Sequence, residues 1–399
     1  MKNKQHIDHN QLEYLNLGMP NKQTYIQDIQ LSGYKSIKSV SCDFEEGLNI
    51  IIGNNGSGKS NLLEFIYQVL SRQYAGLGLF KADININRED KDSKKEIFNW
   101  HAESDIQTDV NGPNLQKIAI SEPDLKNSFI IEFVRFNLPI KIEVISSEFN
   151  SKFDLGQRWL MFDSVEERIP TSILFWLQML FFAQKKSDAD FEKLNDDDLY
   201  RLLSDSFNAS FEVTKKKINT YTPIEDIRVN KSVRIANIDS STLEFRNIVL
   251  EYKMNNEWYS WNALSDGTKR LIYLIFTIEG IEIRNDSGGI IRGAFPITLI
   301  EEPELGIHPH QLHLILNYLK EKAKEQQIIL TTHSPQVLDI LETTELNKII
   351  IAEIDFEKGT NLRHLNNDET KKTQAYFKDQ GLLSDYWRFS DFQRTKNVK

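Results

Sequence analysis

One segment constrains this chain more than any other. Residues Gly53 to Ser60 read GNNGSGKS and match the phosphate-loop pattern, Gly-x-x-x-x-Gly-Lys-Ser/Thr. The apolar run Leu48 to Ile52 precedes the loop and predicts a strand buried on both faces. The run Asn61 to Leu70 follows it with the apolar spacing of a helix. A glycine-rich turn that matched by chance would lack these flanks, so the loop predicts backbone N–H groups that converge on nucleotide phosphates.

Each part of this loop has a chemical role. The Lys59 ammonium can reach the β- and γ-phosphates, and the Ser60 hydroxyl can ligate Mg²⁺. The helix that starts near Lys59 adds its positive N-terminal dipole. We therefore expect ATP and Mg²⁺ as cofactors. The nucleotide-binding residues predicted here are Asn54, Asn55, Gly56, Ser57, Gly58, Lys59, Ser60 and Asn61.

Two carboxylates end a second apolar run. Residues Ile297 to Ile300 predict a short buried strand, and Glu301 and Glu302 follow directly. A phosphate-loop enzyme needs one carboxylate for the metal and another group that orients or deprotonates water. We assign Glu301 to the metal and Glu302 to the water. Aspartate is more usual at the metal position, so the longer Glu301 could reach the metal through a water molecule. A solvated acidic turn is the simpler alternative for the pair in isolation.

Two further segments have ambiguous meanings alone. Ser265 can cap a helix that opens at LSDGTKR, and Gly267 leaves backbone exposed, so this helix start could grip a γ-phosphate or be an ordinary N-cap. His333 follows the buried run Ile328 to Thr332, where a side chain at the carboxyl end of a parallel strand faces the ligand crevice. It could hydrogen-bond the γ-phosphate or the attacking water, or be a structural histidine.

Composition narrows the class of protein. The 399 residues carry a net charge of −10, which argues against a protein coated with basic surface, although a local basic groove stays open. The single cysteine, Cys42, allows no internal disulfide and no cysteine-based metal site. The N-terminus lacks the apolar core of a signal peptide, and the run Ile173 to Ala183 is shorter than the roughly 20 residues that span a bilayer. We expect a cytoplasmic protein without membrane segments.

The order of apolar runs predicts an α/β fold. Alternating residues around Ile29 and Val40 predict two half-buried strands, and strands alternate with helices again after residue 241. The residues between, 76–240, hold charge clusters and scattered strand-like runs without heptads. The expected division is a polar extension at 1–23, an N-lobe at 24–75, an insertion serving as lid or assembly region at 76–240, a C-lobe at 241–365 and a tail at 366–399.

The ordered set of motifs resembles an ABC-type ATPase head of the RecF/SMC/OLD-like branch, often grouped with AAA-family ATPases. The resembling segments are IQLSGYKSIKSVSCDFEEGLNIIIGNNGSGKSNLLEFI, LSDGTKRLIYLI, ITLIEEPELGIHPH and IILTTHSP. The resemblance implies a mixed sheet flanked by helices, interrupted by the insertion. It implies that LSDGTKR is the ABC signature, that PELGIHP is the D-loop region and that His333 is the switch histidine.

The resemblance also implies how such heads work. They close as dimers or larger homo-oligomers, in which the signature of one subunit caps ATP on the phosphate loop of the other. Lys35 stands where this branch places a basic residue near the nucleotide. The family's Q-loop glutamine is not assigned, because Gln68 and Gln73 lie on or just after the first helix.

Two functions follow from the resemblance. The first is the sensor or regulatory ATPase of a bacterial antiphage defence complex, with a separate nuclease or toxin as effector. The second is a RecF-like repair ATPase that binds DNA directly, with Lys215 to Lys217 and Arg228 to Arg234 as the basic candidates. A second acidic set, Glu353, Asp355 and Glu357, alternates before Gly359 and is interpreted as the solvent face of a hairpin rather than a metal site.

Overall fold

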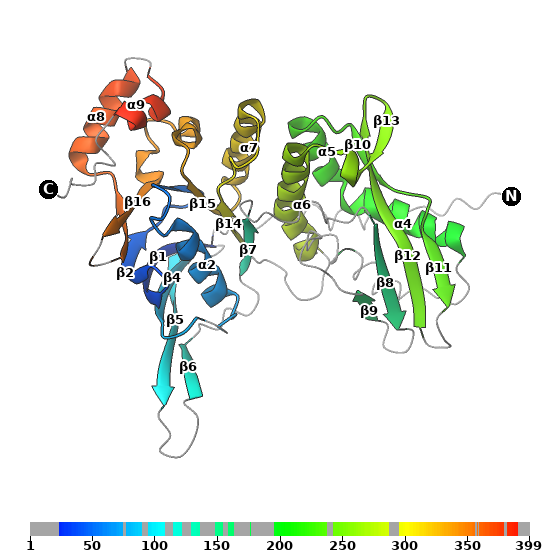
Figure 1. Ribbon diagram of the computed structural model, residues 1–399, viewed down its shortest axis with the longest axis horizontal. Helices are drawn as coiled ribbons and strands as arrows, with labels where there is room; N and C mark the ends of the chain where they lie inside the picture. The colour runs from blue at the N-terminus through cyan, green and yellow to red at the C-terminus, as the bar shows by residue number, and fades with distance from the viewer. Residues whose placement is uncertain are drawn as a thin grey trace.

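The computed structural model describes most of the chain after the N-terminal 23 residues. The described ranges are 24–74, 77–89, 95–107, 115–121, 129–135, 148–154, 159–162, 176, 195–237, 242–286, 295–355, 357, 359–378 and 381–389. Two sheets lie at opposite ends of an elongated molecule, with helices α6 (Asp266–Asp286) and α7 (Pro309–Lys322) between them (Figure 1).

The larger sheet has 11 strands in the order β6-β5-β4-β1-β2-β17-β16-β3-β15-β14-β7. Its parallel part runs from β16 to β7, and the remaining pairs are antiparallel. The strands are β1 (Thr24–Tyr34), β2 (Ile37–Asp43), β3 (Leu48–Ile52), β4 (Lys81–Glu89), β5 (Lys95–Gln107), β6 (Leu115–Ser121), β7 (Phe129–Arg135), β14 (Phe295–Glu301), β15 (Gln327–Thr332), β16 (Ile349–Asp355) and β17 (Gly359–His364).

Side-chain alternation along these strands sorts residues onto two covered faces. Ile51, Leu299 and Ile329 share a buried cluster with helix α2 (Lys59–Leu70), including its Leu62 and Ile66. Residues of the opposite parity, Ile50, Ile300 and Leu330, belong to the cluster that contains Leu312 and Ile315 of α7. Because both faces are buried, the parallel strands consist of nearly continuous apolar runs. This alternation also fixes which face the residues at the strand ends occupy.

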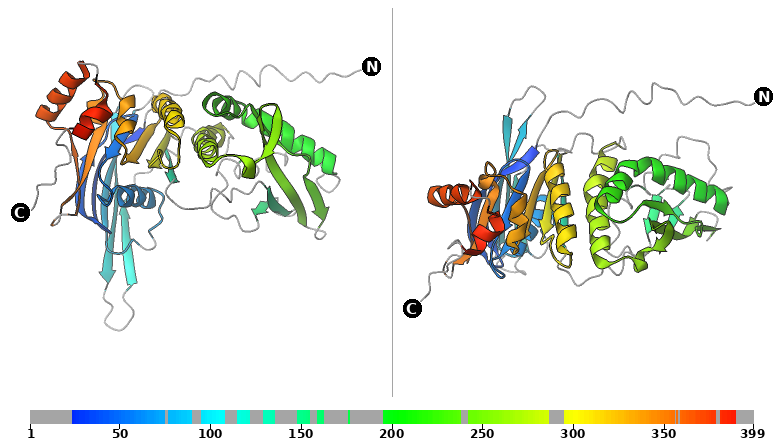
Figure 2. Two further views of the ribbon diagram at one scale, coloured as in Figure 1. Left: turned by 45° about the horizontal axis from the view of Figure 1, so that its top comes forward. Right: turned by 90° about the horizontal axis from the view of Figure 1, so that it is seen from above.

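The smaller sheet has six strands: β8 (Glu148–Asp154), β9 (Trp159–Phe162), β10 (Asp226–Val229), β11 (Arg234–Asn237), β12 (Thr242–Met254) and β13 (Glu257–Ser260). Helices α4 (Asp196–Ser210) and α5 (Glu212–Tyr221) accompany it. Seen from above, this body lies beyond α6, on the side away from the larger sheet (Figure 2). The remaining helices are α8 (Asn367–Lys378), α9 (Leu383–Phe389) and the 3-10 helices η5 (Trp261–Ala263), η6 (Pro335–Ile340) and η7 (Leu346–Lys348).

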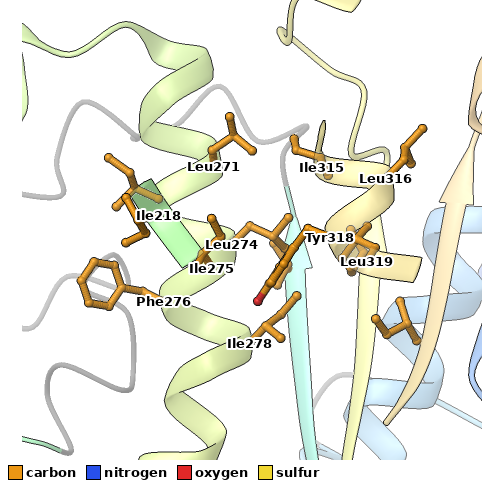
Figure 3. Close-up of a cluster of buried hydrophobic side chains, with 14 of the residues drawn as sticks. Ile218, Leu271, Leu274, Ile275, Phe276, Ile278, Ile315, Leu316, Tyr318 and Leu319 are labelled. Carbon is orange, nitrogen blue, oxygen red and sulfur yellow. The ribbon is translucent and has the colours of Figure 1, made fainter. Parts of the chain in front are cut away.

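Helices α6 and α7 join the two bodies. Leu271, Leu274 and Ile278 of α6 belong to one buried cluster with Ile315 and Leu319 of α7 (Figure 3). A polar contact also crosses this interface between α6 and α7. The Tyr318 hydroxyl donates to Glu279 at 2.9 Å, and the Lys322 ammonium lies 2.9 Å from the same carboxylate. Both charged side chains are buried, so breaking this pair would leave an uncompensated charge in the core.

The α/β fold expected from the sequence is confirmed, and so are its central elements. The strand before the phosphate loop, the helix after it and the strands before Glu301 and His333 all form. Asn255 and Asn256, both with positive φ, make the tight turn between β12 and β13. The apolar run at 173–183 lies outside the described residues except for Trp176.

The sheets do not divide at residues 76 and 240. Strands β4 to β7 belong to the larger sheet, because β4 pairs with the free edge of β1 and β7 with β14. Strand β12, in the range expected for the C-lobe, pairs with β8, β10 and β11 of the smaller sheet. These pairings join segments far apart in the chain, and local apolar spacing carries no signal of them. Among the described helices, none combines the length and the apolar character needed to cross a membrane.

Candidate active site at the carboxyl ends of the parallel strands

Four neighbouring parallel strands deliver the candidate residues to one edge of the sheet. Strand β3 leads into the phosphate loop, β15 ends before His333, β14 ends with Glu301, and β7 ends with Arg135. Since the strands are parallel, their carboxyl ends meet at the same edge, which is where open α/β sheets bind ligands. The predicted P-loop, carboxylate pair and histidine are therefore brought together.

The phosphate loop presents an open outer face over a packed base. Asn54, Asn55 and Gly56 are exposed, whereas Ser57 is buried. Gly58 has a φ of 91°, and a Cβ there would lie 1.9 Å from the Thr360 hydroxyl of β17. Both the left-handed conformation and the close approach require glycine at this position. The base of the loop thus packs against β17, a contact that the sequence did not indicate.

Lys59 lies folded into this loop. Its ammonium donates to the carbonyl oxygens of Gly53 at 2.7 Å and Asn54 at 3.0 Å, and the side chain is buried. Burial lowers the pKa of Lys59, and the carboxylates of Glu302, Glu304 and Glu301 oppose that shift. A cation held in place by its own loop and surrounded by carboxylates is suited to meet phosphate charge.

Glu301 is fully buried and has a partner that the sequence analysis missed. The Arg135 Nε donates to its Oε2 at 2.9 Å. The two residues are opposite one another in the β14–β7 register and point to the face covered by α2. Strand β7 thus supplies the side chain beside the predicted metal carboxylate. The run Phe129 to Val134 was a signal for the strand, but its neighbour in the sheet could not be deduced from it.

Glu302 and His333 are close to one another and share a third carboxylate. The His333 Nδ1 lies 3.5 Å from Glu302 Oε1 and 3.5 Å from Glu304 Oε1. Glu302 has a φ of 47°, a left-handed conformation that costs a non-glycine residue about 1–2 kcal/mol. Backbone outliers of this kind concentrate at functional sites. The turn lifts Glu302 out of the sheet while its N–H still bonds Thr331.

Glu304 is the second residue that the sequence reading did not single out. Its Oε1 accepts from the Thr332 hydroxyl at 2.6 Å, the His333 N–H at 3.1 Å and the Ser334 N–H at 3.3 Å. Three donors converge on one carboxylate oxygen, which ties the loop after β14 to the loop that carries His333. The segment PELGIHP contained Glu304, but only the fold shows that its side chain reaches the next strand.

The site fits a magnesium ion bound together with nucleotide phosphates. Within the described residues, no group of three or more His, Cys, Asp or Glu side chains could hold a metal alone. Magnesium in phosphate-loop sites instead takes one or two protein oxygens plus phosphate oxygens and water. The buried oxygen atoms without a hydrogen-bond partner in this part of the chain include Glu301 Oε1 and Thr331 Oγ1, on adjacent strands beside the loop. An orphaned carboxylate oxygen of this kind is suited to a cation.

Lys35 lies beside the phosphate-loop helix and is already paired. Its ammonium is 2.7 Å from Glu64 of α2, and its φ is 48° in the turn between β1 and β2. Asn61 donates to the Ser36 hydroxyl in the same turn at 2.9 Å. The turn between β1 and β2 is therefore fixed on the helix that follows the loop, which is consistent with a place near the nucleotide.

The predicted signature segment lies at the start of α6, outside the four strand ends that carry the other candidates. Ser265 caps α6, accepting from the Thr268 N–H at 3.2 Å, and it is exposed. Gly267 is buried beside Gln311 of α7, and Arg270 donates to the Leu305 carbonyl. Strand β7 lies between α6 and α2 and contacts both helices (Figure 1). In the described part of the chain, neither a hydrogen bond nor an ion pair connects Ser265 or Gly267 to the phosphate loop.

The other charged candidates have structural partners. Lys215, Lys216 and Lys217 pair with Asp226, Glu212 and Glu321, and Arg228 and Arg234 pair with Glu251 and Asp196. Each of these five cations thus has a carboxylate partner within the chain. Glu353 pairs with Arg363 across the β16–β17 hairpin, while Asp355 and Glu357 are exposed. This acidic set is the face of a hairpin, as the alternation predicted.

Comparison with known proteins gives consistent matches. The family model described as "AAA domain, putative AbiEii toxin, Type IV TA system" matches residues 48–112 and 134–339, more than half of the chain. The Septu protein PtuA of Bacillus thuringiensis is 25% identical over 346 residues, covering 86% of this chain and 79% of the relative. The Retron Ec83 probable ATPase of Escherichia coli is 25% identical over 390 residues, covering 81% and 71%. A crystal structure of an SMC head bound to the C-winged helix domain of ScpA aligns with a TM-score of 0.46 at 18% identity, covering 87% of this chain and 99% of that chain.

Proposed function

This chain belongs to the AAA family whose model matches it, and from that premise we propose that it hydrolyses ATP in a site shared between two copies of itself. Family membership confirms the expected ATPase and the resemblance to the ABC-type heads. The residue roles, the dimer and the effector are our proposals. The observation that supports them best is the meeting of Lys59, Glu301, Glu302 and His333 at the ends of adjacent parallel strands.

In the proposed reaction each residue acts where it already lies. The open face of the loop, Asn54 to Gly56, receives the phosphates, and Lys59 turns from its own carbonyls toward them. Ser60 and Glu301 would hold Mg²⁺, which when bound supplies positive charge to the phosphate oxygens. Glu302 orients and deprotonates the attacking water, and His333, 3.5 Å from Glu302, bonds the γ-phosphate or that water.

Completion of the site requires a second copy. Within the described residues, the exposed Ser265 at the start of α6 has neither a hydrogen bond nor an ion pair to the phosphate loop of its own chain, and this exposed helix start is suited to an anion. A symmetric pair brings each signature to the partner's loop, and such self-complementary contacts are typical of homodimers. The dimer then forms only when nucleotide is present at the interface.

The biological setting that we propose is antiphage defence with a separate effector. It is supported by the relatives named as a Septu protein and a retron ATPase, and by the toxin named in the family description. In this setting ATP-dependent closure would restrain or release the effector. The alternative, direct DNA binding, is weakened by the ion-paired lysines and arginines of the smaller body.

The variant Glu302→Gln tests the reaction. The amide keeps the size of the side chain but cannot accept a proton, so we expect ATP binding to persist while hydrolysis falls by about 100-fold or more. Single-turnover hydrolysis measures the loss, and light scattering should show a dimer trapped with ATP. The matched control is Glu342→Gln, an exposed glutamate that pairs with Lys320. Hydrolysis by Glu302→Gln at the wild-type rate would overturn the assignment of Glu302.

A further inference from the structure

Four charged side chains of alternating sign lead from the turn between β1 and β2 into the candidate metal site. The Lys35 ammonium lies 2.7 Å from Glu64 Oε2. The Arg135 guanidinium lies 3.8 Å from the same Glu64 oxygen and donates its Nε to Glu301 at 2.9 Å. The first member, Lys35, is 48% exposed and the last, Glu301, is fully buried. The row therefore connects an exposed cation to a carboxylate that solvent does not reach.

Arg135 stands between two acceptors and holds them unequally. It makes a hydrogen bond of normal length to Glu301 but only a long contact to Glu64. The guanidinium has further N–H groups that can bond a second carboxylate. It also lies 4.9 Å from the centre of the Phe133 ring, which supports it from the same strand. A small rotation could thus transfer the main bond from Glu301 to Glu64.

A divalent cation and this guanidinium would share one carboxylate, since Arg135 bonds Glu301 Oε2 while Oε1 has no hydrogen-bond partner. In the proposed function Glu301 holds the metal, and a fully buried carboxylate without a counter-charge would be strongly destabilised. Arg135 supplies that charge in the protein alone. When a metal arrives, a second positive charge at Glu301 is repelled by the first.

We propose that Arg135 is an exchangeable counter-ion for Glu301, which it yields to the divalent metal by shifting its bond to Glu64. The proposal rests on the assignment of Glu301 to the metal. Its consequence reaches the other end of the row. As Glu64 takes up Arg135, its hold on Lys35 weakens, and Lys35 becomes available to the nucleotide beside α2. Arg135 is a positioning residue in this scheme, because it acts through Glu301 and Glu64.

Metal affinity measures the exchange without requiring turnover. Mn²⁺ is titrated into the full-length protein with saturating ADP, and free Mn²⁺ is read by electron paramagnetic resonance. Arg135→Gln removes the competitor, so Mn²⁺ should bind about tenfold more tightly than in the wild type. Glu64→Gln removes the negative charge of the alternative acceptor, so Arg135 stays on the charged Glu301 and Mn²⁺ should bind about tenfold more weakly. The two variants thus shift affinity in opposite directions.

Arg363→Gln is the matched control. Arg363 is likewise half-buried and bridges two glutamates, Glu353 and Glu369, but it lies on β17 away from the carboxyl ends of β14 and β7. Its variant should leave Mn²⁺ affinity unchanged. If Arg135→Gln folds poorly, the weaker binding expected of Glu64→Gln still decides the matter. Wild-type affinity in both variants contradicts the exchange.

A spectroscopic signal separates exchange from a simple field effect. The Nε–H resonance of Arg135, assigned by its loss in Arg135→Lys, should move when Mg²⁺ is added with ADP, while that of Arg363 should not. A resonance that stays in place while metal binds means that Arg135 keeps Glu301 and the exchange is wrong. A wild-type protein that binds neither ADP nor Mn²⁺ would instead contradict the proposed function, so the two failures are distinct.

Discussion

The two halves of the proposed site differ in how completely one chain satisfies them. At the phosphate loop the charged side chains have partners within the chain: Lys59 bonds carbonyl oxygens of its own loop, and one oxygen of Glu301 bonds Arg135. At the signature, Ser265 and Asp266 are exposed at the start of α6, and the buried Gly267 packs on α7. The first half is formed before any ligand arrives. The second half presents a helix start to the outside.

This difference indicates a division of labour. A half whose loop and charged side chains already meet within one chain is suited to bind nucleotide without a second chain. The exposed half at the start of α6 can act only on a second molecule. The α6–α7 interface ties the two, since α6 begins at the predicted signature and α7 follows the predicted D-loop region. Binding at one half can therefore influence how the other is presented.

The largest effect is expected from Lys59→Ala. The substitution removes the buried ammonium from the phosphate loop. Because its charge-assisted bonds to phosphate are lost, ATP affinity should fall by about 100-fold or more. Isothermal titration calorimetry with a non-hydrolysable ATP analogue measures it. The control is Lys38→Ala, which removes a lysine of strand β2 that donates to the Glu357 carbonyl. Unchanged affinity in Lys59→Ala would mean that the phosphate loop does not bind nucleotide.

The outward half is tested by Ser265→Arg. A bulky cation at the start of α6 should block the partner's nucleotide, so hydrolysis should fall by about 100-fold while binding by the single chain persists. Steady-state phosphate release and calorimetry measure the two quantities. Ser260→Arg, at an exposed position at the end of β13, controls for the added arginine. Loss of both binding and hydrolysis would indicate misfolding instead of a blocked interface.

Mixing the two inactive variants sharpens the comparison. A dimer of one Lys59→Ala chain and one Ser265→Arg chain has one doubly defective site and one intact site. Equal mixing makes about half of the dimers of this kind, so activity should return to about a quarter of the wild-type value. A site contained within one chain would show no recovery, because each chain carries its own defect.

The sequence predicted the local parts of this site well. The loop, its flanking strand and helix, and the carboxylates at the end of β14 lie within short segments, where spacing alone carries the signal. Arg135 and Glu304 were missed because their importance arises from neighbours far along the chain. Arg135 is separated from Glu301 by 166 residues, and only the pairing of β7 with β14 brings them together.

The arrangement of the sheets was less accessible for the same reason. The apolar alternation in β4 looks alike whether the strand belongs to an insertion or to the main sheet. The strand joins the main sheet because it pairs with the free edge of β1, and no local pattern reveals which segment will pair there. Motifs bound to ligand chemistry are therefore visible in a single sequence, whereas the supports behind them depend on topology.

The smallest effect is expected from Glu304→Gln, which tests the link between the two strand ends. The amide oxygen can still accept from Thr332, His333 and Ser334, but it loses the negative charge that strengthens these bonds. We expect a loss of about 1 kcal/mol in the free energy of unfolding and about a tenfold fall in hydrolysis, with ATP affinity unchanged, because His333 moves relative to Glu302. Urea unfolding and single-turnover hydrolysis measure the two losses.

The control is Glu345→Gln, a half-buried glutamate that also accepts from a backbone N–H and pairs with two lysines. Glu345→Gln should lose as much stability as Glu304→Gln but keep full hydrolysis. An equal loss of hydrolysis in the two variants would mean that Glu304 acts on stability and not on the placement of His333.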